Sequence, residues 1–178
     1  MYPINPKGGE ILGQTAYVSV KDVPGDVDQA IIVIPAKFVP DALRECVEKG
    51  VDTAVVISAG FSEVHTDEGN DLEEQVKEIV AKSQQANKPI SLIGPNCLGV
   101  LRPRIGMNGS FAKELPAVGN VALVSQSGAM AVAIMDASPA MHIGYSYVAS
   151  IGNKATMDEC DFLEILEQDD ETKVIGFY

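Results

Sequence analysis

Three short apolar runs in the first half of the chain restrict its fold most strongly. They are rich in Ile, Val, Leu and Ala and occupy residues 29–34, 53–57 and 89–93. Strands that are apolar on both faces are typical of a parallel sheet with cover on both sides. Apolar stripes at helical spacing separate the runs, and alternating strands and helices build such a sheet. We therefore expect an α/β fold.

The two helical patterns carry end signals. The first is expected to begin at Pro40 and to end at Gly50, which suits a left-handed C-terminal cap. The second is expected to begin near Asn70, with Glu73 completing a capping box. Glu73 and the neighbouring charged residues are interpreted as solvated helix faces.

Each of the three predicted strands ends in a turn of small or cyclic residues. Ligands of parallel α/β sheets bind beyond the carboxyl ends of the strands. The turns expected at this edge are Pro35-Ala36-Lys37, Ser58-Ala59-Gly60 and Gly94-Pro95-Asn96.

After residue 101 the pattern is interrupted and then resumes. Residues 101–119 contain Pro and Gly turns without a periodic run, so we place a domain boundary between residues 116 and 117. Beyond it, strands are predicted at 121–124, 145–151 and 173–178, and helices at 128–137 and 158–168. Because the last strand reaches the end of the chain, the second domain, residues 117–178, is expected to be incomplete.

The turn Ser125-Gln126-Ser127-Gly128 lies between a predicted buried strand and a predicted buried helix. A helix that begins there directs its free N–H groups and positive dipole end at the turn. Hydroxyl groups and a close backbone then favour an anion, usually phosphate. The same residues also suit simple helix capping, and the residues alone leave both interpretations open.

Composition excludes several classes of function. The net charge of −12 argues against nucleic acid and anionic membranes, and no apolar run spans a bilayer. The N-terminus has no signal peptide, so a cytoplasmic protein is expected. The spacing of Cys46, Cys97 and Cys160 fits neither a disulfide framework nor a zinc site. With His65 and His142 as the only histidines, no metal site is expected.

Five segments occur together in a distinctive order: residues 2–9 (YPINPKGG), 56–63 (VISAGFSE), 93–99 (IGPNCLG), 121–129 (VALVSQSGA) and 152–154 (GNK). This set resembles the NDP-forming acyl-CoA synthetases, above all the α-type ADP-forming acetyl-CoA synthetases, with succinyl-CoA synthetase α subunits as more distant relatives. The resemblance implies a Rossmann-like CoA-binding domain, residues 1–116, followed by a flavodoxin-like domain. It also implies a reaction of acyl-CoA, ADP and phosphate that yields the acid, CoA and ATP through an acyl phosphate and a phosphohistidine.

The resemblance also assigns roles to residues. CoA would be bound by the three carboxyl-end turns and by the N-terminal turn: Lys7, Gly8, Gly9, Pro35, Ala36, Lys37, Ser58, Ala59, Gly60, Pro95 and Asn96. The phosphoryl group would be held by Ser125, Gln126, Ser127 and Gly128. Separately from the resemblance, Asn153 and Lys154 follow the carboxyl end of the predicted strand 145–151, a position from which they could face the same site. CoA or acyl-CoA and phosphate are the expected ligands. Mg-ADP or Mg-ATP and an ATP-grasp β subunit or domain are implied for the complete enzyme, which is expected to be oligomeric.

Three departures from the family limit this expectation. The glycine-rich CoA fingerprint and the first β-α unit are not in the chain, and neither is the acidic residue that orients the phosphohistidine. The phosphohistidine motif has no counterpart either, so we expect no catalytic residue here and no complete synthetase activity from this chain alone. An alternative is a CoA-sensing regulatory module of a protein acetyltransferase. A serine hydrolase is disfavoured, because Ser125 and Ala129 stand where a nucleophile elbow around Ser127 needs glycine.

Overall fold

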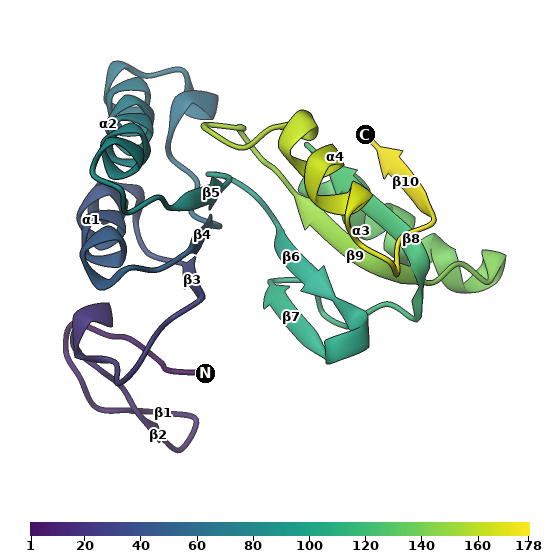
Figure 1. Cartoon of the computed structure of the whole chain (residues 1–178), viewed down its shortest axis with the longest axis horizontal. Coiled ribbons are helices and arrows are strands. Elements are labelled where there is room, and N and C mark those ends of the chain that lie inside the picture. Colours follow the sequence, from purple (N-terminus) through teal and green to yellow (C-terminus); the bar gives the residue numbers. More distant parts are fainter.

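The first three predicted strands form one parallel sheet in the computed structural model, which describes residues 1–178 (Figure 1). They are β3 (Gln29–Ile32), β4 (Thr53–Val56) and β5 (Ser91–Ile93), hydrogen-bonded in the order β3-β4-β5. The pairing is in register, with Ala30 opposite Ala54 and Ala54 opposite Leu92. The carboxyl ends of all three strands therefore lie at one edge, as predicted.

Two helices cover one face of this sheet. α1 (Val39–Lys49) ends at Gly50, whose φ of 82° is the left-handed conformation expected from the sequence. α2 (Asp67–Gln85) packs beside it. Apolar side chains of both helices form one core with the strands, including Leu43, Val76 and Leu92, each 0% exposed.

The predicted start of α2 at Asn70 is wrong by one turn. Thr66 is the N-cap, and its side chain accepts a hydrogen bond from the Gly69 N–H at 3.1 Å. Asn70 lies inside the helix and its N–H donates to the Thr66 carbonyl. Threonine is as capable a cap as asparagine, and the sequence contains both within one turn. Glu73 is consequently freed for a different contact, described below.

The second half of the chain forms a five-stranded sheet of order β10-β8-β9-β6-β7. Its strands are β6 (Gly99–Arg102), β7 (Met107–Ser110), β8 (Val118–Ser125), β9 (Tyr145–Ser150) and β10 (Val174–Phe177). The last three predicted strands pair in parallel through β8, whereas β6 is antiparallel to β9 and β7.

The hairpin β6–β7 occupies part of the region for which no element is predicted. Its strands are only four residues long, and the 3-10 turn Pro103–Ile105 separates them. Neither strand is therefore long enough for an alternation of apolar and polar residues to be recognised. The chain passes from the first sheet to the second between Ile93, the end of β5, and Gly99, the start of β6, which is earlier in the chain than residue 116. The division into domains at 116–117 stays a prediction.

Helices α3 (Gly128–Ala137) and α4 (Glu159–Glu167) cover opposite faces of the second sheet. Ala131 and Met135 of α3 share a core cluster with Leu123. Phe162 and Leu166 of α4 share another cluster with residues of the opposite parity on β8, Ala122 and Val124.

The two sheets share a core. Val55 and Ile93 of the first sheet belong to the cluster that holds Val100 and Ala149 of the second. The helix-free face of the first sheet is therefore partly covered by the second half of the chain. The predicted fold class, a Rossmann-like parallel α/β unit followed by a flavodoxin-like α/β unit, is confirmed.

The N-terminal segment contains more structure than predicted. A hairpin of β1 (Glu10–Ile11) and β2 (Gln14–Thr15) precedes a 3-10 turn at Val20–Asp22. Hydrogen bonds from Ser19 to Glu45 at 2.7 Å and from Lys21 to Glu48 at 3.1 Å attach the segment to α1. No helix in the chain has both the length and the apolar character needed to cross a bilayer.

The three cysteines are free thiols. Burial raises the pKa of Cys46 to about 11 and that of Cys97 to about 12, so both are unreactive near neutral pH. Cys160 is exposed.

Candidate functional site

Ser58 joins the first two carboxyl-end turns. Its hydroxyl donates to the Ile34 carbonyl at 2.6 Å and accepts from the Ile34 N–H at 3.1 Å. Two residues after Ser58, a Cβ built on Gly60 would lie 3.1 Å from the Cβ of Ala36. The turns after β3 and β4 are therefore in direct contact, and Gly60, at a φ of 110°, permits that approach.

The third turn is bound to the second. The Asn96 N–H donates to the Ser58 carbonyl at 2.9 Å, so Pro35–Lys37, Ser58–Gly60 and Gly94–Asn96 form one continuous edge. Lys37 is exposed there, with its ammonium 4.9 Å from the centre of the Phe38 ring. This edge thus offers one cation, an aromatic ring and several backbone groups to a ligand.

The Lys7–Gly9 turn is separate from this edge. Its hydrogen bonds stay within the N-terminal segment: the Lys7 N–H donates to the Asn5 side chain at 2.9 Å, the Gly8 N–H to the Asn5 carbonyl at 2.8 Å, and the Ala16 N–H to the Gly9 carbonyl at 2.9 Å. No hydrogen bond joins it to the turns after β3, β4 or β5. The role of Lys7, Gly8 and Gly9 in CoA binding stays a prediction.

The turn between β8 and α3 has the geometry expected of a helix cap. Ser127 is the N-cap and accepts from the Met130 N–H at 3.3 Å, while the Ser125 hydroxyl accepts from the Ser127 N–H at 3.2 Å. The N–H groups of Gly128 and Ala129 have no intrahelical acceptor and remain available. The capping interpretation is confirmed, and it leaves two donors and the helix dipole for an anion.

Gly128 places this turn against the first sheet's last loop. A Cβ on Gly128 would lie 3.2 Å from the Leu98 Cβ, and Leu98 follows the Gly94–Asn96 turn by two residues. The candidate phosphoryl turn and the candidate CoA edge are therefore neighbours, although 29 residues or more separate them in the sequence.

Ser150 is a residue that the sequence analysis did not identify. It ends β9 directly opposite Ser125, and both are 0% exposed. Its hydroxyl has no hydrogen-bond partner, a state that costs about 1–3 kcal/mol in a buried site. Val148, two residues earlier and on the same face, packs in the cluster of α3, so Ser150 points towards the first turn of that helix.

Two carboxylates, Glu63 and Glu73, form a cluster that the sequence analysis also missed. Glu73 is only 6% exposed, so its predicted place on a solvated face is wrong. Burial by itself would raise the pKa of each carboxyl. The hydrogen bonds that the carboxylates accept lower the pKa by more than burial raises it. Glu63 accepts from the Gly60 N–H and from Asn153, and Glu73 accepts from Ser62 and Asn153. Both pKa values therefore lie below 4.5.

Lys154 is ion-paired, and both histidines lie in exposed turns. The Lys154 ammonium is 3.0 Å from the Glu159 carboxylate at the start of α4. His65 and His142 are exposed residues that end short 3-10 turns.

The depressed pKa of Glu73 predicts a pH-dependent stability. A group whose pKa is lowered by folding stabilises the fold above its unfolded value, near 4.5, and loses that contribution as the pH falls through the folded value. Glu73→Gln should therefore lower the urea midpoint at pH 7, and its difference from wild type should shrink towards pH 3. Glu78→Gln, on the exposed face of α2, is the control with little effect. A Glu73→Gln difference that is unchanged at pH 3 would contradict the assignment.

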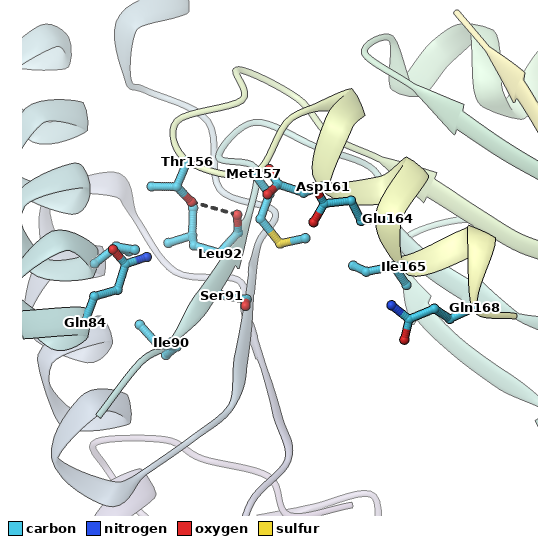
Figure 2. Close-up of a pocket in the computed structure, with 11 residues that line it drawn as sticks. Gln84, Ile90, Ser91, Leu92, Thr156, Met157, Asp161, Glu164, Ile165 and Gln168 are labelled. Carbon is cyan, nitrogen blue, oxygen red and sulfur yellow. Dashed lines mark hydrogen bonds between the residues drawn. The ribbon is translucent and has the colours of Figure 1, made fainter. Parts of the chain in front are cut away.

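One cavity lies away from these turns. A groove of about 420 Å³ runs between β5, α2 and α4, and Figure 2 shows Asp161 and Glu164 at its α4 side. Two of its lining residues are joined by a hydrogen bond, which the Thr156 hydroxyl donates to the Leu92 carbonyl at 3.0 Å. It contains no predicted site residue and no cation, and its two carboxylates would repel the phosphates of CoA.

Comparison with known proteins decides the family. Residues 1–103 match the family described as CoA binding domain, and residues 118–178 match the succinyl-CoA ligase like flavodoxin domain. The chain belongs to the CoA-binding domain family of the NDP-forming acyl-CoA synthetases. Both matches agree with the two α/β units of the structure.

Named relatives support the assignment over the whole chain. It is 49% identical to an ADP-forming acetate–CoA ligase of Methanocaldococcus jannaschii, covering 100% of this chain and 24% of that protein. It is 42% identical to the α subunit of ADP-forming acetate–CoA ligase II of Pyrococcus furiosus, covering 100% of this chain and 37% of that subunit. The chain therefore spans only a quarter to two fifths of these relatives.

A solved structure shows the same arrangement. The acetyl-coenzyme A synthetase 1 of Ca. Korarchaeum cryptofilum, in complex with phosphate and ADP, superposes with a TM-score of 0.89 at 38% identity. The match covers 99% of this chain and 36% of that chain. The two α/β units of this chain are therefore arranged relative to one another as in the Ca. Korarchaeum cryptofilum protein.

Proposed function

We propose that this chain is the CoA-binding portion of an ADP-forming acyl-CoA synthetase. The observation that carries the proposal is the continuous edge formed by three turns, which Ser58 and the Asn96 N–H hold together. Pantetheine and nucleotide would lie along this edge, and Lys37 would face a phosphate of CoA. The complete reaction would further require a phosphohistidine and bound Mg-ADP. Other residues or subunits, such as an ATP-grasp β subunit, would supply them.

Lys37 gives the most direct test of the CoA edge. A charge-assisted contact to a phosphate contributes about 1.5–3 kcal/mol, so Lys37→Ala should weaken CoA binding about tenfold or more. Isothermal titration of CoA into wild type, Lys37→Ala and Lys88→Ala makes the comparison, since Lys88 is exposed at the far end of β5. Equal affinities of wild type and Lys37→Ala would refute the role of Lys37. Lys7→Ala in the same titration tests the N-terminal turn.

We propose that the turn before α3 binds the phosphoryl group, with Ser125, Gln126, Ser127 and Gly128 around it. Capping and anion binding can be separated with Ser127→Gly, because glycine replaces serine at an N-cap at a cost of only a few tenths of a kcal/mol. Inorganic phosphate should raise the melting temperature of wild type above that in chloride of equal ionic strength. The variant should melt near wild type in chloride and gain less from phosphate, because it lacks the Ser127 hydroxyl but keeps the Gly128 and Ala129 N–H groups. An undiminished gain would leave Ser127 a cap only.

Two further points complete the proposal. The chain by itself should make no ATP from acetyl-CoA, ADP and phosphate, and measured formation of ATP would contradict this. A cytoplasmic location fits the three free thiols, which persist in reducing compartments. The alternative of a CoA-sensing regulatory module shares the CoA edge, but it gives no role to a phosphate-binding turn before α3.

A further inference from the structure

Asn153 reaches from the second half of the chain into the first. Its amide nitrogen donates to Glu63 Oε2 at 2.6 Å and to Glu73 Oε2 at 2.9 Å, and it lies 3.3 Å from Ser62 Oγ. Its amide oxygen accepts from Asn96 Nδ2 at 3.1 Å. The partners lie 57 to 91 residues earlier in the chain. One side chain therefore contacts α2, the loop before it and the Gly94–Asn96 turn.

The carboxylates around Asn153 are fixed independently of it. Glu63 Oε1 accepts from the Gly60 N–H at 2.6 Å. Glu73 accepts from the Ser62 hydroxyl and forms an ion pair with Lys77 at 3.3 Å. The cluster is rich in acceptors, so it suits a neutral NH₂ group and disfavours another carboxylate.

The backbone beside Asn153 holds the same turn from the other side. The Asn153 N–H donates to the Pro95 carbonyl at 2.9 Å, and the Ala155 N–H donates to the Gly94 carbonyl at 3.1 Å. Because the Asn96 N–H is bound to Ser58, the Gly94–Asn96 turn is held between the two halves of the chain. On one side lie the other two turns of the CoA edge, and on the other lie Leu98 and the turn before α3.

We propose that Asn153 is a positioning residue for the Gly94–Asn96 turn. It fixes this turn between the other two turns of the CoA edge and the phosphoryl turn before α3. Its relevance to acyl transfer rests on the proposed function. Group transfer between two sites requires reacting atoms to be held about 3–3.5 Å apart, so a small displacement of this turn reduces the rate. Asn153 acts through the turn and touches neither ligand.

The test uses charge at constant shape. Asn153→Asp replaces the NH₂ donor with a third carboxylate, which both glutamates repel. The triple variant with Glu63→Gln and Glu73→Gln restores amide–carboxylate pairing with the roles exchanged. Hydrogen exchange of wild type, Asn153→Asp, Asn153→Ala and the triple variant is measured at pH 7 without ligand, and circular dichroism establishes that each is folded.

We expect Asn153→Asp to speed exchange of the Asn96, Asn153 and Ala155 N–H groups at least tenfold, with Asn153→Ala showing a smaller increase. Amides of β4 and α1 should stay within threefold of wild type, and the triple variant should recover to within threefold at the turn. Exchange at the turn that is unchanged in both single variants, or that is not recovered in the triple variant, would overturn the proposal. If Asn153→Asp does not fold, Asn153→Ala and the triple variant decide by the same criteria.

Titration of CoA into the same proteins separates the two proposals. With the proposed function correct, Asn153→Asp should bind CoA at least fivefold more weakly and the triple variant should approach wild type. A wild-type chain that binds no CoA would count against the proposed function, while the exchange rates would still decide the positioning role of Asn153.

Discussion

Replacing Gly152 with alanine is expected to destabilise the fold by about 2–5 kcal/mol, which combines left-handed backbone strain of about 1–2 kcal/mol with overpacking of about 1–3 kcal/mol. Gly152 has a φ of 56°, and a Cβ there would lie 2.1 Å from the Pro95 carbonyl oxygen and 2.6 Å from that of Asn96. Neither atom can yield easily, because both belong to the backbone of the turn held between the two halves.

Gly106 provides the matched control. Its φ is 68°, but a Cβ there would meet no atom within 4 Å. Gly106→Ala should therefore show the backbone strain alone, about 1–2 kcal/mol. Urea unfolding at pH 7 measures both variants. If Gly152→Ala costs no more than Gly106→Ala, the close approach of the Gly152 loop to the Gly94–Asn96 turn is contradicted.

Replacing Phe61 with alanine should cost about 3–5 kcal/mol, the range for deleting a fully buried aromatic side chain. Phe61 is 0% exposed and lies in the core cluster under α1 and α2, directly after the Ser58–Gly60 turn. Its N–H also donates to Glu63 at 3.2 Å. Alanine keeps this N–H, so the cavity left by the ring, directly beside the Ser58–Gly60 turn, is what should loosen the CoA edge as well as reduce global stability.

The same substitution at Phe111, which is 67% exposed, is the control and should change the unfolding free energy by about 0.5 kcal/mol or less. Urea unfolding compares the two variants. Similar losses from both would show that Phe61 does not anchor the turn.

The parallel sheet and its ligand edge were predictable because their signals are local. Apolar runs mark β3, β4 and β5, and the turns that follow them necessarily share an edge once the strands are parallel. The Ser127 cap was equally accessible, since serine before an apolar helix has a known local function.

The cluster around Asn153 was not predictable, because its members have no common local pattern. Glu73 reads as one of several acidic residues on a helix, and its partners Ser62 and Asn153 lie outside that helix, where helical periodicity gives no information. Ser150 is one serine at the end of an apolar strand, and its unpaired hydroxyl is evident only once β8 and β9 are aligned. Contacts over 90 residues depend on how the two halves pack, which strand and helix periodicity does not specify.

If the three turns after β3, β4 and β5 form the CoA-binding edge, titration with CoA should change the amide chemical shifts of these turns. We expect saturable shifts concentrated in the N–H groups of residues 36–37, 58–60, 94 and 96–97, with small shifts along the groove at Gln84, Met157 and Glu164. Shifts that are absent at millimolar CoA, or that concentrate along that groove, would contradict this role of the three turns.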